Sequence, residues 1–216
     1  PLGSNLSWKR AYLTNTVKKL LPVFVLCLCF SGFIWSIQTG QSLIGPIGVF
    51  LGTWIVVGTL VDLLSKLGSS KSVRRFMFLP RADYGKFFAH VGLGMTMFAI
   101  AALTSWEKED IRVVPIGSSW ALGSYELKLE NIIETRGPNY FSTMGVIQVS
   151  KKGLAITTLR PEKRNYPIAQ MPTTEAAIDY RISRDLYVVL GDKQSDKAWT
   201  VRTYLKPFTN WIWGGC

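Results

Sequence analysis

The stretch "YGKFFAHVGLGMTMFAIAALTSW", residues 84–106, decides the fold class of this chain. From residue 87 to residue 106 it contains no Asp, Glu, Lys or Arg. A helix needs about 20 predominantly apolar residues to cross the hydrocarbon core of a bilayer. The stretch is therefore predicted to be a membrane-spanning helix, and it contains the single histidine of the chain, His90.

Two further apolar stretches precede this one. The segment "LLPVFVLCLCFSGFIWSI" occupies residues 20–37, and "IGVFLGTWIVVGTLVDLL" occupies residues 47–64. The first resembles a signal peptide at its start, but the run is long and no small-residue cleavage site follows it. We therefore expect a transmembrane helical region over residues 1–106, with spans at 20–37, 47–64 and 84–106.

The net charge of +11 is unevenly distributed along the chain. The first 105 residues contain 10 Lys and Arg but only two acids, and these bases lie before the first span and between the second and third. Because short cytoplasmic loops are enriched in Lys and Arg, we expect both basic segments to be cytoplasmic and residues from 107 onward to lie on the other side. No nucleic-acid motif accompanies the charge, so we expect membrane-flanking charge and a membrane-lipid environment rather than a nucleic-acid partner. The basic loop from Lys66 to Lys86 could hold anionic lipid, but the positive-inside bias already explains it.

Residues 107–206 are predicted to form one external antiparallel β domain, a small barrel or sandwich. Period-2 alternation predicts strands in "DIRVVPI", "SYELKLENII", "MGVIQVSKKGLAITTL" and "DLYVVLGDKQSDKAWTVRTYL". Within these, "SKKG" and "GDKQSDK" are expected to be hairpin turns, and "GPNY", "RPEKRNYP" and "MPTTEAA" are expected to be breaks between strands. Thr173 or Thr174 is expected to cap a short helix.

The last residues, 207–216, are expected to begin a fourth span. Lys206 and Pro207 favour a helix start, but a helix from Phe208 to Cys216 would cover only about 13 Å of the ~30 Å of hydrocarbon. We therefore expect the chain to be part of a longer protein, with "PLGS" as either a cloning scar or native sequence. The expected fold class is a membrane α-helical bundle fragment, with three full transmembrane helices, the start of a fourth and an inserted β-rich extramembrane domain.

His90 is the candidate functional residue. An ionisable group at membrane depth is costly, and it usually faces a bundle interior, a cavity or a ligand. Gly94, Met97 and Ala101 share its helix face by spacing, and Gly92 and Gly94 are expected to leave room for something flat and bulky. Three interpretations remain open: a hydrogen bond to a neighbouring backbone, a proton relay, for which no intramembrane acid is suitably placed, and an axial ligand to haem iron.

Other residues that could carry chemistry receive structural interpretations. The three cysteines, Cys27, Cys29 and Cys216, show no metal-binding or CxxC spacing, and the first two lie in an apolar run where thiols behave as small hydrophobes. A charged cluster comprises Glu175, Asp179, Arg181, Arg184 and Asp185. Its carboxylates are expected to be ion-paired, and thus to serve structure or partner docking rather than acid–base catalysis. The aromatic residues are Trp199, Tyr204, Phe208, Trp211 and Trp213. They are expected to form an interfacial belt, with a haem-stacking platform as the alternative.

Several long blocks of the sequence resemble the C-terminal part of the CcmF family, the large membrane subunit of the bacterial cytochrome c maturation system. These blocks are "LSWKRA", "FFAHVGLGMTMFAIA", "GPNY", "RPEKRNYPIAQMPTTEAAIDYRISRDLYVVLGD" and "AWTVRTYLKPFTNWIWGG". They occur in the family's order and extend from about residue 6 to residue 216. The resemblance therefore covers essentially the whole chain.

The resemblance implies a haem lyase component. Such a protein takes haem from a CcmE-type chaperone and, with CcmH- or CcmI-type partners that hold apocytochrome c, directs its covalent attachment. The family also holds a b-type haem between two transmembrane histidines. Its second histidine lies in a motif like "AHLGL", which is "AHVGL" here, so the resemblance implies that His90 is one axial ligand of a haem b.

The departures from the family's pattern are equally informative. The first transmembrane histidine, the tryptophan-rich haem-handling segment and its external histidines all lie upstream of this sequence. The resemblance thus implies a half-site that needs the missing N-terminal part and is not active as a lyase alone. Two alternatives stay open: a non-catalytic docking module of the maturation complex, and the related haem lyase that serves a nitrite-reductase cytochrome. The implied location is the bacterial inner membrane with a periplasmic β domain, or the mitochondrial inner membrane if the protein is organellar.

Overall fold

The computed structural model describes residues 13–37, 42, 44–67 and 76–216. By its internal contacts the chain divides into two compact units. A helical unit combines residues up to Trp106 with the C-terminal segment Phe208–Cys216, and a β unit comprises Glu107–Pro207.

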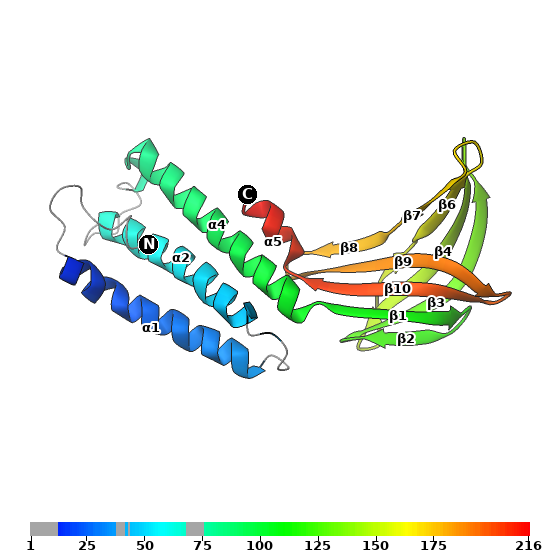
Figure 1. The fold of residues 1–216 in the computed structure, drawn as a ribbon, viewed down its shortest axis with the longest axis horizontal. Helices are drawn as coiled ribbons and strands as arrows, with labels where there is room; N and C mark the ends of the chain where they lie inside the picture. Colours follow the sequence, from blue (N-terminus) through cyan, green and yellow to red (C-terminus); the bar gives the residue numbers. More distant parts are fainter. Residues whose placement is uncertain (1–12, 38–41, 43, 68–75) are drawn as a thin grey trace. The chain divides into compact units, whose positions relative to one another are not determined.

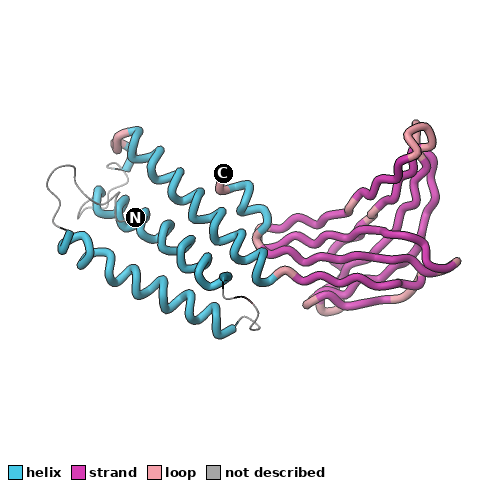
Figure 2. The backbone as a smooth tube through the Cα atoms, in the orientation of Figure 1, coloured by secondary structure: helices cyan, strands magenta, loops and turns pink. Residues whose placement is uncertain are grey.

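The helical unit contains three long apolar helices (Figures 1 and 2): α1 (Leu13–Ile37), α2 (Ile44–Leu67) and α4 (Arg81–Trp106). Each of them contains a window that is long and apolar enough to span a membrane. All three extend beyond the apolar runs because flanking polar residues, such as Lys66 in the last turn of α2, continue the helix. Together with the β unit, these helices confirm the predicted fold class.

Small residues bring α2 and α4 close together. A Cβ atom added to Gly52 would lie 2.8 Å from the carbonyl oxygen of Gly94, and one added to Gly48 would lie 2.5 Å from Cβ of Ala101. Membrane helices use such positions to bring their backbones into close contact. The helix α1 packs on α2, where the Ser31 hydroxyl donates a hydrogen bond of 2.5 Å to the carbonyl oxygen of Pro46.

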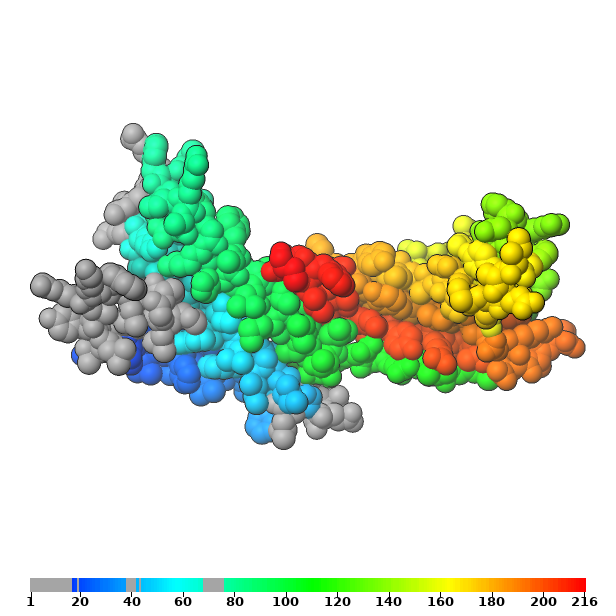
Figure 3. Space-filling model, turned by 45° about the horizontal axis from the view of Figure 1, so that its top comes forward, coloured from blue at the N-terminus to red at the C-terminus, as the bar shows by residue number. Residues whose placement is uncertain are grey.

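The C-terminal helix α5 (Thr209–Gly214) packs against α4, as the red segment in Figure 3 shows. Rings from both helices meet there, since the centroids of Phe208 and Trp211 lie 5.4 and 6.0 Å from that of Phe98. The expectation that Lys206 and Pro207 begin this helix is wrong. Pro207 is the last residue of a strand, and Phe208, with φ of 54°, makes the change to helix.

The β unit consists of two antiparallel sheets. The first has the order β1-β10-β9-β8, and the second has the order β2-β3-β4-β6-β7 with β5 paired to β4. The strands are β1 (Lys108–Pro115), β2 (Ser119–Leu122), β3 (Tyr125–Arg136), β4 (Phe141–Lys151), β5 (Leu154–Leu159), β6 (Glu162–Tyr166), β7 (Met171–Glu175), β8 (Ala177–Arg181), β9 (Arg184–Ser195) and β10 (Ala198–Pro207).

The core of the β unit lies between these two sheets. Its fully buried members are Leu127, Leu129, Ile147 and Val149 from one sheet and Leu186, Val188, Leu190 and Val201 from the other. Alternate residues of β2, β3, β4, β9 and β10 point inward, which is the period-2 pattern that predicted these strands. The predicted turn "SKKG" is confirmed, since Lys152 and Gly153 both have positive φ, as two-residue hairpin turns require.

Two segments that were expected to be breaks are strands instead. The blocks "RPEKRNYP" and "MPTTEAA" contain β6 and β7, which pair with each other, and β6 also pairs with the start of β4. Thr173 and Thr174 therefore lie in a strand and cap no helix. No alternation marks these strands because neither of their faces contains a fully buried side chain.

Candidate functional site

His90 lies on α4 with a half-buried ring whose orientation is set by the backbone. Its Nδ1 atom is 2.8 Å from the carbonyl oxygen of Lys86, one turn earlier. A carbonyl oxygen can only accept a hydrogen bond, so Nδ1 carries the proton and donates it. This bond fixes the tautomer and leaves the lone pair of Nε2 for another partner.

Four charged residues surround the same turn of α4. Asp62 of α2 is buried, with 6% of its surface exposed, and its carboxylate forms an ion pair with Lys86. Lys66 lies 3.8 Å from Asp62 and also pairs with Asp83. Two carboxylates thus neutralise two ammonium groups, which is the arrangement that makes buried charge tolerable.

Lys86 connects the charged residues to the histidine. Its side chain pairs with Asp62, while its carbonyl oxygen accepts the hydrogen bond from His90. The sequence analysis did not identify this connection, although an Asp inside an otherwise apolar stretch was a signal for it. Asp62 of α2 and His90 of α4 thus contact the same residue, the first through its side chain and the second through its backbone.

The two glycines near His90 make room for protein rather than for a flat group. A Cβ atom on Gly94 would lie 2.6 Å from Cγ2 of Val56 and 2.9 Å from the carbonyl oxygen of Gly52, both on α2. The space beside Gly92 is filled by the backbone of Gly215. The expectation that these glycines leave room for a bulky flat group is wrong, because neighbouring helical segments occupy that space.

The described residues around this turn offer one imidazole and no cluster of metal-binding side chains. In the described ranges, no group of three or more His, Cys, Asp and Glu side chains could hold a metal ion. His90 offers a single imidazole whose Nε2 does not take part in the bond to Lys86. A haem iron takes its other protein ligand on its opposite face, so that ligand would have to come from a further residue.

Most of the predicted charged cluster comes together in the β unit. Arg184 is buried, with 7% of its surface exposed. Its Nη1 atom lies 2.7 Å from Oδ2 of Asp179, and its Nε donates a hydrogen bond of 2.8 Å to the Tyr125 hydroxyl. Asp185 is fully buried and accepts a hydrogen bond of 3.3 Å from the backbone N–H of Arg181. The bond to Tyr125 links the two sheets, the other contacts join β8 to β9, and together they give the cluster a structural role.

Glu175 does not belong to this cluster. It lies 3.8 Å from Arg164 of the neighbouring strand. The same guanidinium lies 2.9 Å from Glu162, and this hydrogen bond is the main reason that the pKa of Glu162 is lowered. A carboxylate held ionised in this way is poorly suited to be a general acid.

The predicted aromatic residues are divided between the two units. Trp199 is 8% exposed in the core of the β unit, and Tyr204 lies on β10. Phe208 and Trp211 pack with Phe98 in the helical unit, where Trp213 is 77% exposed. The five residues therefore form no single stacking platform for a haem.

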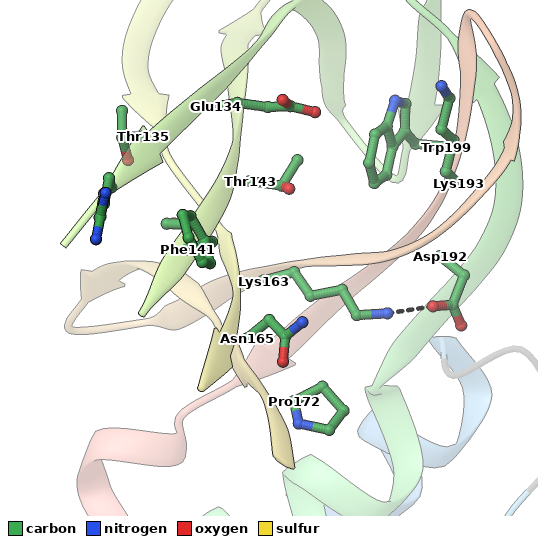
Figure 4. Close-up of a pocket in the computed structure, with 12 residues that line it drawn as sticks. Glu134, Thr135, Phe141, Thr143, Lys163, Asn165, Pro172, Asp192, Lys193 and Trp199 are labelled. Carbon is green, nitrogen blue, oxygen red and sulfur yellow. Dashed lines mark hydrogen bonds and ion pairs between the residues drawn. The ribbon is translucent and has the colours of Figure 1, made fainter. Parts of the chain in front are cut away.

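A groove of about 930 Å³ lies in the β unit (Figure 4). Glu134 and Lys163 extend from β3 and β6 toward the β9–β10 hairpin, where Asp192 and Trp199 lie. The full lining is Glu134, Thr135, Arg136, Phe141, Ser142, Thr143, Lys163, Asn165, Pro172, Asp192, Lys193 and Trp199. The sequence analysis missed this groove because it assigned the residues of β6 and β7 to breaks.

Comparison with known proteins gives the family. The family model described as "CcmF C-terminal beta-sandwich" matches residues 105–207, which is the β unit with its approach from α4. The chain belongs to the CcmF family. It is 43% identical to the cytochrome c-type biogenesis protein ccl1 of Rhodobacter capsulatus over all of this chain and 33% of that protein. It is 35% identical to CycK of Rhizobium meliloti over all of this chain and 32% of that protein.

This CcmF-family chain spans about one third of the length of the curated relatives that it matches. A solved structure named "Cytochrome c Heme Lyase CcmF" aligns with 99% of this chain and 35% of its own, with a TM-score of 0.70 and 18% sequence identity. At that identity the comparison establishes the shared fold. The resemblance to CcmF is confirmed, and the three apolar helices fit a membrane protein of this family.

Proposed function

We propose that this chain is the C-terminal part of a cytochrome c haem lyase component and supplies one axial ligand, His90, to an intramembrane haem b. The relatives are named for cytochrome c-type biogenesis, and the related solved structure is named a haem lyase. The observation that carries the ligand assignment is the bond between Nδ1 of His90 and the Lys86 carbonyl. It leaves Nε2, the usual iron-binding atom of such a histidine, as the unprotonated nitrogen.

When bound, a haem would supply a redox-active iron within the membrane. The chain's own residues would hold and orient the ligand. The Lys86 carbonyl limits rotation of the His90 ring, and a hydrogen bond to the non-ligating nitrogen also raises the basicity of the imidazole. Asp62 would hold the Lys86 side chain against α2, and the helix α4 itself positions that carbonyl.

The second haem ligand and the partners of the reaction would come from outside this chain. We place the second histidine in the N-terminal part of the same longer protein. Haem would arrive on a CcmE-type chaperone, and CcmH- or CcmI-type subunits would present apocytochrome c. The membrane would be the bacterial inner membrane, with Lys66 and Lys86 near the cytoplasmic face and the β unit in the periplasm, because the basic residues of the first 105 lie before α1 and in its first turns, and from the end of α2 to the first turns of α4.

The test is co-expression of this chain with the upstream part of the protein, followed by purification and a pyridine haemochrome spectrum. We expect b-type absorbance in the wild-type complex and its loss with His90→Ala, at an unchanged level of complex. The matched control is Thr104→Ala on the same helix, which removes only hydroxyl bonds to backbone carbonyls within α4. Retention of full b-type absorbance by His90→Ala would overturn the ligand assignment.

A docking role for the β unit is the second candidate function. The observation that favours it is the polar groove between β3, β4, β6 and the β9–β10 hairpin. This role would hold whether or not His90 binds iron, so loss of the haem assignment would leave it intact.

A further inference from the structure

The inner face of the larger sheet changes character along its length. Near the start of β3 it presents the apolar core, whereas near the end it presents polar and charged side chains to the groove. The register places these side chains in two rows across the strands. One row is Arg136, Phe141, Asn165 and Pro172, and the other is Glu134, Thr143, Lys163 and Thr174. The core thus ends, and a polar cradle begins, within one continuous sheet.

The outer edge of β3 is unpaired along this cradle. The strand β2 pairs only with residues 125–128 of β3, and the last bonds on that side join Leu129 to Gly117 and Ser118 at 2.6 and 3.1 Å. A register shift follows between Leu129 and Asn131, as in a β-bulge. Beyond it, within the described chain, β3 has a strand partner only on the side of β4. Residues 130–136 therefore present an edge beside the groove with no neighbouring strand, on which the N–H of Ile132 donates a hydrogen bond of 2.8 Å to Oδ1 of Asn131.

Two opposite charges on this edge have no ionic partner. Within the groove, Lys163 pairs with Asp192, and Lys193 lies 3.3 Å from Asp196. Glu134 and Arg136 take part in none of the ion pairs of the described residues. The Arg136 guanidinium instead lies 5.5 Å from the ring centroid of Phe141, which is 50% exposed.

We propose that residues 130–136 of β3 bind an extended segment of a partner protein, which adds to this edge as an antiparallel strand. Free strand edges beside a pocket recognise peptides in this way: main-chain bonds give affinity and alternate side chains give specificity. Antiparallel pairing places an acidic residue of the partner opposite Arg136 and a basic residue, two positions later, opposite Glu134. The segment recognised therefore has the pattern acid, any residue, base.

The other sheet edges suit this role less well. The edge strands β2, β7 and β8 are shorter than the free part of β3, and β7 also contains Pro172. The edge strand β1 is longer but contributes no residue to the groove, and it ends in Pro115. The end of β9 beyond Val188 also lacks a second strand partner beside the groove, but its groove residues Asp192 and Lys193 already form ion pairs. The end of β3 combines an unpaired edge, room for a partner's side chains, and an acid and a base that form no ion pair within the described residues.

The probe is a fluorescein-labelled peptide, Thr-Val-Asp-Val-Lys-Val-Thr, with its charge-reversed form Thr-Val-Lys-Val-Asp-Val-Thr as comparison. Binding is measured by fluorescence anisotropy to the whole chain in detergent or nanodiscs. We expect the first peptide to bind about tenfold more tightly than the second, and the preference to reverse with the double variant Glu134→Lys, Arg136→Glu. Hydrogen exchange at residues 130–136 should slow when the matched peptide is bound.

The matched control is the double variant Glu126→Lys, Lys128→Glu. These residues are also an acid and a base two positions apart on β3, but there β2 already occupies the edge, so the peptide preference should not change. The proposal would be overturned if the wild-type chain and the Glu134→Lys, Arg136→Glu variant each bound both peptides equally. It would also be overturned if neither protein bound either peptide. Binding to this chain but not to the longer protein would also overturn it, because the remainder of the same protein would then cover the edge. None of these outcomes depends on His90.

Discussion

The carbonyl oxygen of Lys86 lies 2.8 Å from Nδ1 of His90, and the Lys86 side chain pairs with Asp62 of the neighbouring helix. One residue thus joins the ring of the candidate ligand to a buried carboxylate on α2. The bond to the backbone of α4 limits rotation of the His90 ring, and the ion pair of the Lys86 side chain joins α4 to α2. The two contacts can be tested separately.

Substitution of Asp62 by asparagine should destabilise the helical unit. The change removes a buried charge that two lysines share, and the cost should be roughly 1 to 3 kcal/mol. Resistance of the whole chain to SDS-induced unfolding in detergent micelles measures it. The control is Asp83→Asn, where the side chain is 23% exposed rather than 8%. An equal loss in both variants would show that burial of Asp62 has no special effect.

Substitution of Gly94 by alanine should weaken the contact between α2 and α4. The added methyl group would lie 2.9 Å from a backbone oxygen of Gly52, which cannot move without moving its helix. Overpacking of this kind costs about 1 to 3 kcal/mol. Gly85→Ala on the same helix is the control, since nothing lies within 4 Å of its added Cβ. The prediction fails if SDS unfolding of the Gly94 variant is as resistant as that of the Gly85 variant.

Removal of the Arg184 side chain should open the β unit locally. Arg184→Ala leaves Asp179 and the Tyr125 hydroxyl without their buried partner, and the expected cost is about 3 kcal/mol. Hydrogen–deuterium exchange of β9 and β10 in the whole chain should become faster. Arg181→Ala removes a guanidinium that is 50% exposed, and it should cost less than about 1 kcal/mol. Similar exchange in the two variants would contradict the structural role of the Arg184 cluster.

The proposed membrane orientation predicts which residues an impermeant thiol reagent can reach. In a background with Cys27, Cys29 and Cys216 replaced by alanine, Ser195→Cys in the exposed β9–β10 hairpin should react in intact cells. Met77→Cys, in the segment just before α4 and 70% exposed, should react only after lysis. Labelling of Met77→Cys but not of Ser195→Cys in intact cells would reverse the orientation.

The sequence was sufficient for features that depend on composition over a short window. A helix that crosses the hydrocarbon core needs a long apolar stretch with few charges. Membrane spans were therefore predicted at residues 20–37, 47–64 and 84–106, and these stretches lie inside α1, α2 and α4. Strands with one buried face alternate in period 2, so the strands around Leu127 and Val188 were predicted as well. Several long blocks in the family's order, the motif around His90 among them, together indicated the family.

The strands β6 and β7 could not be predicted in the same way. Their side chains are exposed or half-buried, so no apolar period marks them. They are strands because β4 offers a backbone edge at Phe141 to Met144, which belongs to a distant part of the chain. Without them, the groove and the free edge of β3 could not be inferred.

What the sequence by itself determined is the membrane class, the three spans and the β-rich unit, because each follows from residue type and local spacing; the ligand role of His90 is what the family resemblance implies. What only the tertiary structure decided is which groups meet. It placed Asp62 against Lys86, filled the space beside Gly94 with α2 and ended β2 before the charged end of β3. Such contacts depend on how separate elements pack, and the local pattern of a sequence does not contain that information.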